Sequence, residues 1–352
     1  MKATLIYGAH DIRVESVPDP TVMRPTDALV RVVASCVCGS DLWPYRGVFD
    51  VPQPRRIGHE FVGIVEDIGS DVATVRPGDF VIAPFAISDG TCENCRNGIP
   101  TSCIQNTGWG GNDPFGLPVD AGQGEAVRVP FADGTLVATP ELPAAALIPS
   151  LLTLSDVMGT GHHAAISAGV GPGSVVVVVG DGAVGLCAVL ASKRLGAEQI
   201  IAMSHHPDRQ ALARAFGATG IVAERGEEGS AKVKELLGGI GADAVLECVG
   251  TKESMQQAFD SARPGGRIGY VGVPGGGPVL PIQQMFRNNI NVGGGVAPVR
   301  VYLPELLIDV LNGTIDPGRV FDLELPLEQA ADAYEAMDQR RSIKTLLRPS
   351  GM

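Results

Sequence analysis

The residues best suited to chemistry lie in two short motifs near the amino terminus. Cys38 opens the run Cys-Gly-Ser-Asp, which contains Ser40 and Asp41, and His59 precedes Glu60 at the start of a predicted strand. A thiolate and an imidazole from separate loops, with carboxylates nearby, can form a zinc site that leaves one position open for substrate. Each residue also has an ordinary alternative, as a small buried cysteine or a loop histidine with its own hydrogen bonds. When Cys38 or His59 is considered alone, this ordinary structural role is the better interpretation.

A second set of potential ligands is closely spaced in a loop of low apolar content. Asp89, Cys92, Cys95 and Cys103 follow the spacing D-x2-C-x2-C-x7-C. Such thiolates are typical of a structural zinc site, because the metal holds a loop shape that burial of apolar side chains cannot hold. The fourth ligand would have to be Asp89, and its oxygen should bind more weakly than a fourth sulfur. The alternative is three thiols on a loop without metal.

One segment combines a strand, a glycine turn and a helix. The five valines Val175–Val179 are β-branched and apolar on both faces, as in the middle of a parallel sheet. Gly180, Gly182 and Gly185 follow with the spacing G-x-G-x-x-G, and apolar residues at helical spacing continue to Gly196, which is placed to end the helix. This order is typical of a dinucleotide site, in which the helix N-terminus binds the pyrophosphate. A plain turn between strand and helix is the alternative.

The residues after the next predicted strand bear on coenzyme choice. An NAD site usually has Asp or Glu there, to bind the 2′-hydroxyl of the ribose. This chain has Ser204, His205 and, a little later, Arg209, with no carboxylate at the end of the strand. A hydroxyl and a nearby cation suit a 2′-phosphate better, so we predict NADP(H) in preference to NAD(H). If Arg209 is only a helix-surface residue, the selectivity is loose.

A further carboxylate, Asp156, lies in an apolar setting between the two predicted domains, shortly before His162 and His163. A carboxylate there either caps a helix or binds metal. Neighbouring residues on a helix point about 100° apart, so two adjacent histidines do not easily serve one site. At least one of the two is expected to be structural.

The elements that must position these residues fall into two domains. Residues 1–152 contain short alternating strands separated by turns, which indicates a β-rich domain. Residues 153–296 alternate strands and helices, as in a six-stranded doubly wound sheet, and residues 297–352 are expected to return to the first domain. The expected strands are 28–33, 61–68, 80–83, 126–129, 175–179, 200–203, 221–222, 244–247, 267–271, 290–292 and 343–347, and the expected helices are 207–216, 231–237, 253–263, 304–311 and 327–339.

The bulk composition limits the classes of function. The chain has 352 residues, is 45% hydrophobic and 19% charged, and carries a net charge of −12. This balance is ordinary for a globular protein of two domains, and the negative charge argues against nucleic acid as the partner. No apolar stretch of transmembrane length and no leader are evident, so no membrane partner and a cytoplasmic location are expected. The seven cysteines, an odd number, favour metal ligation or free thiols over disulfides.

Taken together, these motifs resemble the zinc-dependent medium-chain alcohol dehydrogenases. The resemblance covers nearly the whole chain, in the order 38–41, 58–60, 89–103, Asp156 with Thr160-Gly161, 180–185 and 342–345. Asp156 in third place resembles the branch of secondary-alcohol and formaldehyde-type enzymes. The resemblance implies an α/β fold, with a GroES-like β-rich catalytic domain (1–152 and 297–352) and a six-stranded Rossmann coenzyme domain (153–296).

The resemblance also implies roles for particular residues. Cys38, His59 and Asp156 match the catalytic zinc ligands, and Glu60 matches a carboxylate that can approach the metal during exchange. Asp41 would orient the histidine, and Ser40 would take the proton of the alcohol. Thr160 and the backbone around Val271–Val273 match nicotinamide contacts, and Lys344 stands where the family often has a pyrophosphate-binding arginine. The candidate coenzyme-binding residues are Gly180, Gly182, Ala183, Val184, Gly185, Ser204, His205, Arg209, Thr160, Val249, Val271, Val273 and Lys344.

Two positions depart from the family pattern. Asp89 replaces the first of the usual four cysteines, and Trp43 stands where some proton relays have a histidine. The proton would then leave Ser40 through the coenzyme ribose or water, and Trp43 would form a wall of the substrate pocket. Trp109 and Phe115 are further pocket candidates, although both are equally ordinary as core or loop aromatics.

The expected function is reversible hydride transfer between a small-molecule alcohol or carbonyl compound and NADP or NAD, with catalytic zinc and a structural zinc. One alternative is a formaldehyde-type dehydrogenase or dismutase that keeps its nicotinamide coenzyme tightly bound. Another is a non-catalytic nucleotide-binding protein, which predicts an empty or blocked metal site. The resemblance further implies a homo-oligomer, a dimer or tetramer, formed through the strand near 290–296.

Overall fold

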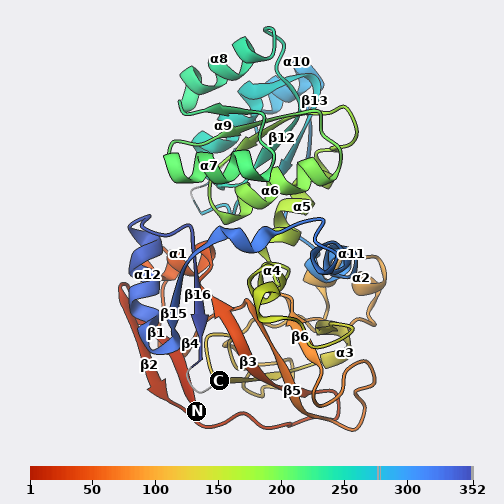
Figure 1. Ribbon diagram of the computed structural model, residues 1–352, viewed down its shortest axis with the longest axis vertical. Helices are drawn as coiled ribbons and strands as arrows, with labels where there is room; N and C mark the ends of the chain where they lie inside the picture. The colour runs from red at the N-terminus through yellow and green to blue at the C-terminus, as the bar shows by residue number, and fades with distance from the viewer. Residues whose placement is uncertain (276, 278, 350–352) are drawn as a thin grey trace. The chain divides into compact units, whose positions relative to one another are not determined.

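The computed structural model describes residues 1–275, 277 and 279–349 and shows two compact units (Figure 1). The first unit comprises residues 1–156 together with the chain from residue 298 onward, and the second comprises residues 157–297. The predicted boundaries, after residues 152 and 296, lie close to these. No helix among the described residues is long and apolar enough to span a membrane.

The first unit is built on two sheets, of which the larger holds the candidate site. Its strand order is β15-β16-β3-β5-β6-β8, and β7 also pairs with β3. Strands β5, β6 and β7 have the predicted bounds, and β3 continues three residues beyond its predicted end. The bounds are β3 (Ala28–Cys36), β5 (Phe61–Ile68), β6 (Phe80–Ala83), β7 (Ala126–Val129), β8 (Val137–Ala138), β15 (Phe321–Pro326) and β16 (Lys344–Arg348). The smaller sheet has the order β2-β1-β4, from β2 (Asp11–Ser16), β1 (Lys2–Gly8) and β4 (Arg55–Arg56).

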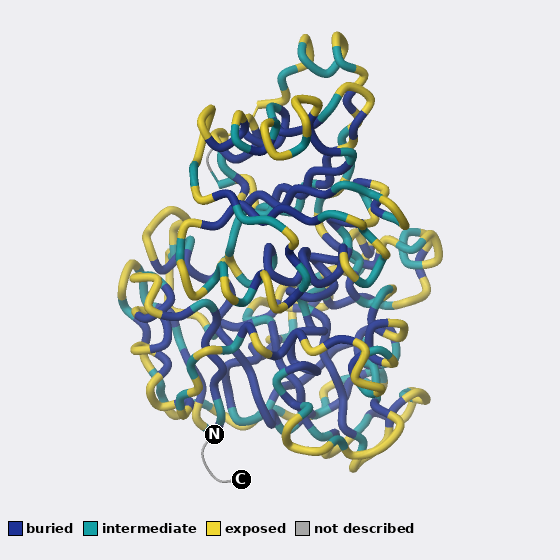
Figure 2. Tube along the Cα trace, turned by 45° about the horizontal axis from the view of Figure 1, so that its top comes forward, coloured by how far each residue is buried: buried dark blue, intermediate teal, exposed yellow. Residues whose placement is uncertain are grey.

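The core of the first unit forms because apolar side chains on these strands face inward. Val30 and Val32 of β3 pack with Phe61 and Val65 of β5 and with Val81 of β6, all buried. The buried strands appear dark blue in Figure 2. At the C-terminal end, β16 pairs with β3, so the last segment of the chain is tied into the same sheet as the candidate ligands.

The first unit also contains short helices and two longer ones near its C-terminal end. The α-helices are α1 (Leu42–Tyr45), α2 (Glu93–Arg96), α3 (Ala132–Thr135), α4 (Ile148–Thr153), α11 (Val299–Leu311) and α12 (Ala330–Asp338). The predicted start of α11 at Pro304 is wrong, since this proline lies inside the helix. Proline suits a first helical turn, which misled the prediction, but here it removes one internal hydrogen bond instead.

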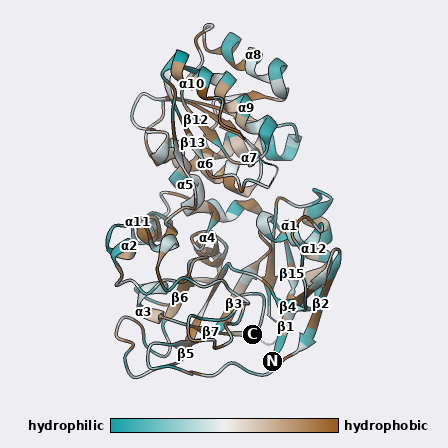
Figure 3. Ribbon diagram, turned by 180° about the vertical axis from the view of Figure 1, so that it is seen from behind, coloured by the Kyte–Doolittle hydropathy of each residue, from teal (hydrophilic) through white to brown (hydrophobic). Residues whose placement is uncertain are grey.

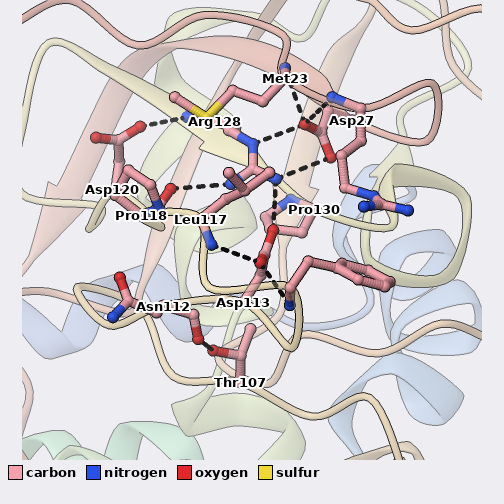
Figure 4. A network of polar contacts seen from close by, with 12 residues as sticks. Met23, Asp27, Thr107, Asn112, Asp113, Leu117, Pro118, Asp120, Arg128 and Pro130 are labelled. Atoms are coloured by element: carbon pink, nitrogen blue, oxygen red, sulfur yellow. Dashed lines mark hydrogen bonds and ion pairs between the residues drawn. The ribbon is translucent and has the colours of Figure 1, made fainter.

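A buried arginine holds an irregular loop against the sheet of the first unit (Figure 4). Arg128 of β7 donates from Nε to Asp27 Oδ2 at 2.6 Å and from Nη2 to Asp113 Oδ2 at 2.7 Å. Its Nη1 donates to the carbonyl of Pro118 at 2.9 Å, and its backbone N–H donates to Asp120 at 2.9 Å. The side chain of Arg128 is 1% exposed. Asp113, Pro118 and Asp120 belong to the loop that carries Trp109, so this ion network fixes that loop.

The second unit is a six-stranded parallel sheet with helices on both faces. Its order is β11-β10-β9-β12-β13-β14, the 3-2-1-4-5-6 order of a Rossmann fold. The strands are β9 (Val175–Val179), β10 (Gln199–Met203), β11 (Gly220–Val222), β12 (Ala242–Glu247), β13 (Ala262–Tyr270) and β14 (Asn291–Gly294). The helices are α5 (Val157–Ser167), α6 (Ala183–Arg194), α7 (Pro207–Phe216), α8 (Gly226–Leu236), α9 (Lys252–Ser261) and α10 (Ile282–Asn288).

The hydrophobic pattern of the second unit explains these elements. Val177, Val245 and Ile268 are fully buried on adjacent strands, and Figure 3 shows the central strands as hydrophobic and α8 as largely hydrophilic. Helix α8 begins five residues before its predicted start. Its first turn carries Glu227 and Glu228, which favour a helix N-terminus electrostatically but add no apolar period to the sequence.

Candidate active site

Four side chains that can bind a metal come together in the first unit. One potential ligand atom from each of Cys38, His59, Glu60 and Asp156 lies within 4.8 Å of the others. Cys38 Sγ is 3.8 Å from Asp156 Oδ2, and His59 Nε2 is 3.5 Å from the same oxygen. Ligand atoms around a tetrahedral zinc ion lie roughly 3.3–3.8 Å apart, given metal–ligand bonds of about 2.0–2.3 Å. The donor types and their spacing therefore fit zinc.

The convergence follows from the pairing of two antiparallel strands. Cys38 comes two residues after β3, and His59 comes two residues before β5, which pairs with β3 so that Ser35 lies opposite Phe61. The end of one strand therefore lies beside the start of the other. Gly58 has φ +107°, and a Cβ there would lie 2.5 Å from a side-chain carbon of Gln123. Glycine before His59 is thus required both by the backbone and by its neighbour.

A hydrogen-bonded chain behind the histidine sets its orientation. Asp41 Oδ1 lies 3.3 Å from His59 Nδ1, and Asp41 Oδ2 accepts the backbone N–H of Cys38 at 2.9 Å. Gln123 reaches Asp41 Oδ2 at 3.5 Å and accepts the hydroxyl of Tyr334 at 3.1 Å. With Nδ1 facing a carboxylate, Nε2 is left to bind a metal. Sequence reasoning missed Gln123 and Tyr334, because neither lies in a recognisable motif.

The charges around His59 make the site attractive to a cation. Burial alone would lower the pKa of His59, but the negative charges of Asp41 and Cys38 outweigh burial and raise this pKa well above its usual value. Burial raises the pKa of the Cys38 thiol. The raised pKa of His59 reflects the negative electrostatic potential of the surrounding side chains, which also favours a bound cation.

Replacing Asp41 by asparagine is expected to weaken zinc binding by about 10–100-fold, because the amide stabilises the bound histidine less than the carboxylate does. Zinc affinity measured by chelator competition tests this. Asp338→Asn is a matched control, since Asp338 pairs with the partly exposed Arg46 and lies outside both groups of ligands. Equal zinc affinity in Asp41→Asn and wild type would contradict the role given to Asp41.

Glu60 and Lys344 form a buried ion pair beside the four-residue group. Glu60 Oε1 accepts Lys344 Nζ at 2.7 Å, and the two side chains are 0% and 1% exposed. Glu60 Oε2 is buried and has no hydrogen-bond partner among the described residues, so an approaching cation would satisfy it. Lys344 was expected to contact the coenzyme pyrophosphate. Because β16 pairs with β3, its amino group instead serves Glu60 and the Val37 carbonyl, so the pyrophosphate contact remains a prediction.

A pocket of about 190 Å³ lies next to the candidate ligands within the first unit. Ser40, His59 and Trp109 line it, and Ser40 Oγ is 3.5 Å from His59 Nε2. The predicted pocket residue Trp43 is not among the lining residues, but its ring lies beside that of Phe49, which lines the pocket, with centroids 6.0 Å apart. Trp109 therefore has the more direct contact with the pocket.

Phe115 lies away from the pocket. Its ring is covered by the guanidinium of Arg24, at 3.5 Å from the ring centroid, and packs near Phe131. The ordinary alternative for this aromatic residue, a loop contact, is therefore the one that the structure supports.

The second ligand group lies in the loop around α2. Cys92 Sγ is 3.5 Å from Cys95 Sγ and 3.8 Å from Cys103 Sγ, and a carboxylate oxygen of Asp89 is within 4.8 Å of all three. The backbone N–H of Asp89 donates to Cys103 Sγ at 3.3 Å. Backbone N–H groups of Cys95 and Ile104 lower the pKa of Cys92 and so favour its thiolate form. Cys92, Cys95 and Cys103 thus form a structural zinc site.

Whether Asp89 completes that site can be tested by two substitutions at one position. Asp89→Ala is expected to weaken binding of the structural zinc by at least the roughly 10–100-fold that loss of a supporting group costs. Asp89→Cys is expected to strengthen it, because sulfur is a softer ligand for zinc than oxygen is. Zinc retention during dialysis against a chelator measures both variants. If Asp89→Ala retained zinc as wild type does, Asp89 would not be a ligand.

The glycine turn of the second unit has the geometry of a coenzyme cradle. Gly180 has φ +114°, and a Cβ at Gly185 would lie 2.1 Å from the Gly180 carbonyl oxygen. A Cβ at Gly182 would meet nothing within 4 Å, so the backbone there is open to a ligand. Helix α6 begins directly afterwards at Ala183, and its first N–H groups, including that of Val184, face the turn.

The predicted adenosine contacts are all held by one carboxylate that sequence reasoning missed. Ser204 Oγ donates to Asp181 Oδ2 at 2.9 Å, and the His205 N–H is 3.3 Å from the same oxygen. Arg209 Nη1 lies 3.3 Å from Asp181 Oδ1. Asp181 stands inside the glycine turn, and the direction of a turn side chain cannot be read from a spacing pattern.

The other coenzyme candidates lie near the carboxyl ends of strands, where doubly wound sheets bind ligands. Val249 follows β12 and is 40% exposed, and Val273 follows β13 and is 44% exposed. The backbone N–H of Val271 donates to the Glu247 carbonyl at 2.9 Å. Thr160 is a buried residue of α5. Their contacts with a nicotinamide ring remain predictions.

The two adjacent histidines of α5 are separate from both ligand groups. His162 is 2% exposed, and burial lowers the pKa of His163. Among the described residues, neither belongs to a group of metal-ligating side chains.

Comparison with known proteins agrees with this geometry. The model of the alcohol dehydrogenase GroES-like domain matches residues 24–141, and that of the zinc-binding dehydrogenase matches residues 183–310. The chain is 32% identical over 355 residues to zinc-type alcohol dehydrogenase B of Aspergillus flavus, covering 99% of this chain and 81% of that protein. It is 31% identical over 391 residues to formaldehyde dismutase of Pseudomonas putida, covering 100% and 98%.

Solved structures show the same relationship. The alcohol dehydrogenase TADH from Thermus sp. ATN1 superimposes with a TM-score of 0.91 and 33% identity, covering 99% of this chain and 100% of that one. The chain therefore belongs to the zinc-dependent medium-chain alcohol dehydrogenase family, and it is a zinc-dependent alcohol dehydrogenase that uses a nicotinamide coenzyme. The predicted family, fold class and enzyme class are confirmed.

Proposed function

We propose that Cys38, His59 and Asp156 hold the catalytic zinc of this alcohol dehydrogenase, and that Ser40 takes the proton of the substrate alcohol. The observation that carries the proposal is the convergence of the ligand atoms, with Glu60, within 4.8 Å of one another. These residues lie far apart in the sequence and come from separate segments, so chance proximity in a metal-like donor set is a poor explanation.

The side chains around the candidate ligands have different roles in alcohol oxidation. When bound, zinc supplies a Lewis acid for the alcohol oxygen and the nicotinamide accepts the hydride. Asp41 keeps Nε2 of His59 directed at the metal position. Ser40 Oγ lies 3.5 Å from that nitrogen, so the hydroxyl would be close to an alcohol oxygen at the metal position and could accept its proton. With Trp43 in place of a relay histidine, the proton would leave Ser40 through the coenzyme ribose or water.

The substrate pocket favours an alcohol with an apolar body. Trp109 and Phe49 line it together with Ile57, and these side chains bury apolar surface of a ligand. The ring of Trp109 is held edge-on against Phe61, with centroids 5.0 Å apart, so this wall of the pocket is fixed by the core.

A formaldehyde-type dehydrogenase or dismutase is the second candidate function. It is supported by the 31% identity with formaldehyde dismutase and by an aspartate in third place among the candidate ligands. Such an enzyme keeps its coenzyme bound, so protein purified without added coenzyme would carry close to one nicotinamide per chain. An alcohol dehydrogenase of the ordinary kind releases it.

The residues at the end of β10 bear on coenzyme preference, and the edge strand β14 bears on oligomerisation. Ser204 and Arg209 favour NADP(H), but both contact Asp181, so this preference depends on whether a phosphate displaces that carboxylate. We also propose a dimer or tetramer formed through β14, because this strand lies at an edge of the six-stranded sheet and an edge strand can pair with a second copy.

A panel of primary, secondary and aromatic alcohols, assayed with NAD and with NADP, tests the proposed function. Wild type is expected to oxidise at least one class, and Ser40→Ala to lower kcat by about 100-fold or more without loss of zinc. Full activity in Ser40→Ala would remove Ser40 from the mechanism. Absence of turnover with every alcohol, together with turnover of formaldehyde, would favour the second candidate.

A further inference from the structure

We propose that Asp181, the residue between the first two glycines of the coenzyme turn, determines coenzyme choice: it supplies the ribose-binding carboxylate and excludes the 2′-phosphate of NADP(H). The inference deepens the proposed function, since it requires only that the glycine turn of the second unit binds a nicotinamide coenzyme. It modifies the sequence-based preference for NADP(H).

Asp181 places a carboxylate where an NAD site usually has one. A Rossmann site for NAD usually takes its ribose-binding acid from the end of the second strand, here β10. No acid stands directly at the end of β10, but Asp181 extends to that strand end from the turn and accepts Ser204 Oγ at 2.9 Å and the His205 N–H at 3.3 Å. A carboxylate therefore stands beside the end of β10, although it comes from another segment.

The groups that would bind a 2′-phosphate are already paired with Asp181. Arg209 Nη1 lies 3.3 Å from Asp181 Oδ1, and these two side chains are only 13% and 15% exposed. The cation and the hydroxyl expected to recognise a 2′-phosphate are thus both engaged by an anion. Burial raises the pKa of Asp181, but the charge of Arg209 and the hydrogen bond from Ser204 lower this pKa by more than burial raises it. The net shift is downward, so the carboxylate is ionised at neutral pH.

The negative charge of Asp181 distinguishes a 2′-phosphate from a 2′-hydroxyl. A phosphate monoester at this place would carry a charge of about −1.5 to −2 close to Asp181, and like charges in a partly buried site repel strongly. A 2′-hydroxyl meets the opposite situation. An ionised carboxylate offers about four acceptor positions, and Ser204, His205 and Arg209 take three of them. One remains for a ribose hydroxyl.

Dissociation constants of NADH and NADPH, measured by calorimetry on the purified zinc-loaded protein, test the inference without reference to turnover. Wild type is expected to bind NADH more tightly than NADPH. Asp181→Asn, which keeps the shape but removes the charge, is expected to shift the ratio of the two constants by about tenfold or more towards NADPH. Asp181→Ser should shift it in the same direction and guards against misfolding of a single variant.

Asp208→Asn is the matched control, because Asp208 is an exposed acid in the first turn of α7 and its loss changes the net charge equally. It should leave the ratio unchanged. Adding Arg209→Gln to Asp181→Asn should weaken NADPH and leave NADH nearly unaffected. If both coenzymes bind but the ratio is the same in Asp181→Asn, Asp181→Ser and wild type, the inference is wrong and the proposed function stands. If neither coenzyme binds wild type, both are wrong.

Discussion

Replacing Cys38 by alanine is expected to lower kcat/KM for alcohol oxidation by more than about 1,000-fold, equivalent to about 4 kcal/mol of transition-state stabilisation. The change removes one of the three proposed zinc ligands, so the metal should be lost or held too loosely to activate the substrate. Coenzyme binding should persist, because the glycine turn belongs to the second unit. Steady-state kinetics, zinc content and NADH binding measure the three effects.

Cys36→Ala is the matched control for this prediction. Cys36 is a buried cysteine of β3, two residues before Cys38, and its sulfur is outside the four-residue ligand group. Its replacement should retain catalytic zinc and most of the activity. Similar losses of activity in both variants would indicate a general disturbance of the strand end. Full turnover in Cys38→Ala would rule out zinc catalysis at this site.

The second large effect is expected from Arg128→Met, which should lower the free energy of unfolding of the first unit by about 3–5 kcal/mol. Methionine fills a similar volume but leaves Asp27 and Asp113 buried without their shared cation (Figure 4). Both tryptophans of the chain, Trp43 and Trp109, lie in the first unit. Their fluorescence during urea denaturation therefore reports the unfolding of that unit.

The same variant should depend on pH in a defined way. Burial raises the pKa of Asp113, but hydrogen bonds from Arg128 and from backbone N–H groups lower it below its usual value. A carboxylate with a depressed folded-state pKa contributes stability above its unfolded-state pKa, and this contribution is lost as the pH falls through the folded value. The difference between wild type and Arg128→Met should therefore shrink towards acid pH.

An exposed ion pair provides the control for Arg128. Arg13 and Asp11 are bonded at 2.7 Å, but their side chains are 52% and 39% exposed, so Arg13→Met should leave the urea midpoint nearly unchanged. Equal stability of Arg128→Met and wild type would show that the buried network adds nothing to the stability of the loop that carries Trp109.

Helices and strands of this chain could be predicted where the local sequence alone contains the signals for their start and end. Val175–Val179 has the predicted bounds because an unbroken β-branched run ends at a glycine turn. Pro207–Phe216 is also found as predicted, since proline suits its first turn and Gly217 takes the left-handed conformation after its end. The start of α8 was missed because its first turn buries no apolar side chain.

The candidate catalytic ligands could be proposed from the sequence only when their motifs were considered together, because none of them is distinctive alone. Cys38 and His59 have ordinary alternatives when each is considered alone, and their order along the chain together with Asp156 is what resembles a known family. Their distances depend on the pairing of β3 with β5, which no local pattern specifies. The motif order gave Lys344 a phosphate contact, which remains a prediction, but it did not reveal the ion pair that strand pairing makes between Lys344 and Glu60.

Side chains that act through long-range hydrogen bonds were not predictable at all. Gln123 and Tyr334 stand 211 residues apart in the sequence, yet they meet behind Asp41. Asp27 and Arg128 are separated by 101 residues and form a buried ion pair. A single sequence contains no periodic or spacing signal for such pairs, because only the fold brings them together.

The central claim is that Cys38, His59 and Asp156 jointly bind one zinc ion at the catalytic centre. Anomalous diffraction at the zinc absorption edge, from crystals of the zinc-loaded protein, tests it most directly. A peak is expected about 2.3 Å from Cys38 Sγ and about 2.0–2.2 Å from His59 Nε2 and an Asp156 oxygen. A fully zinc-loaded crystal with no peak among these three residues would contradict it.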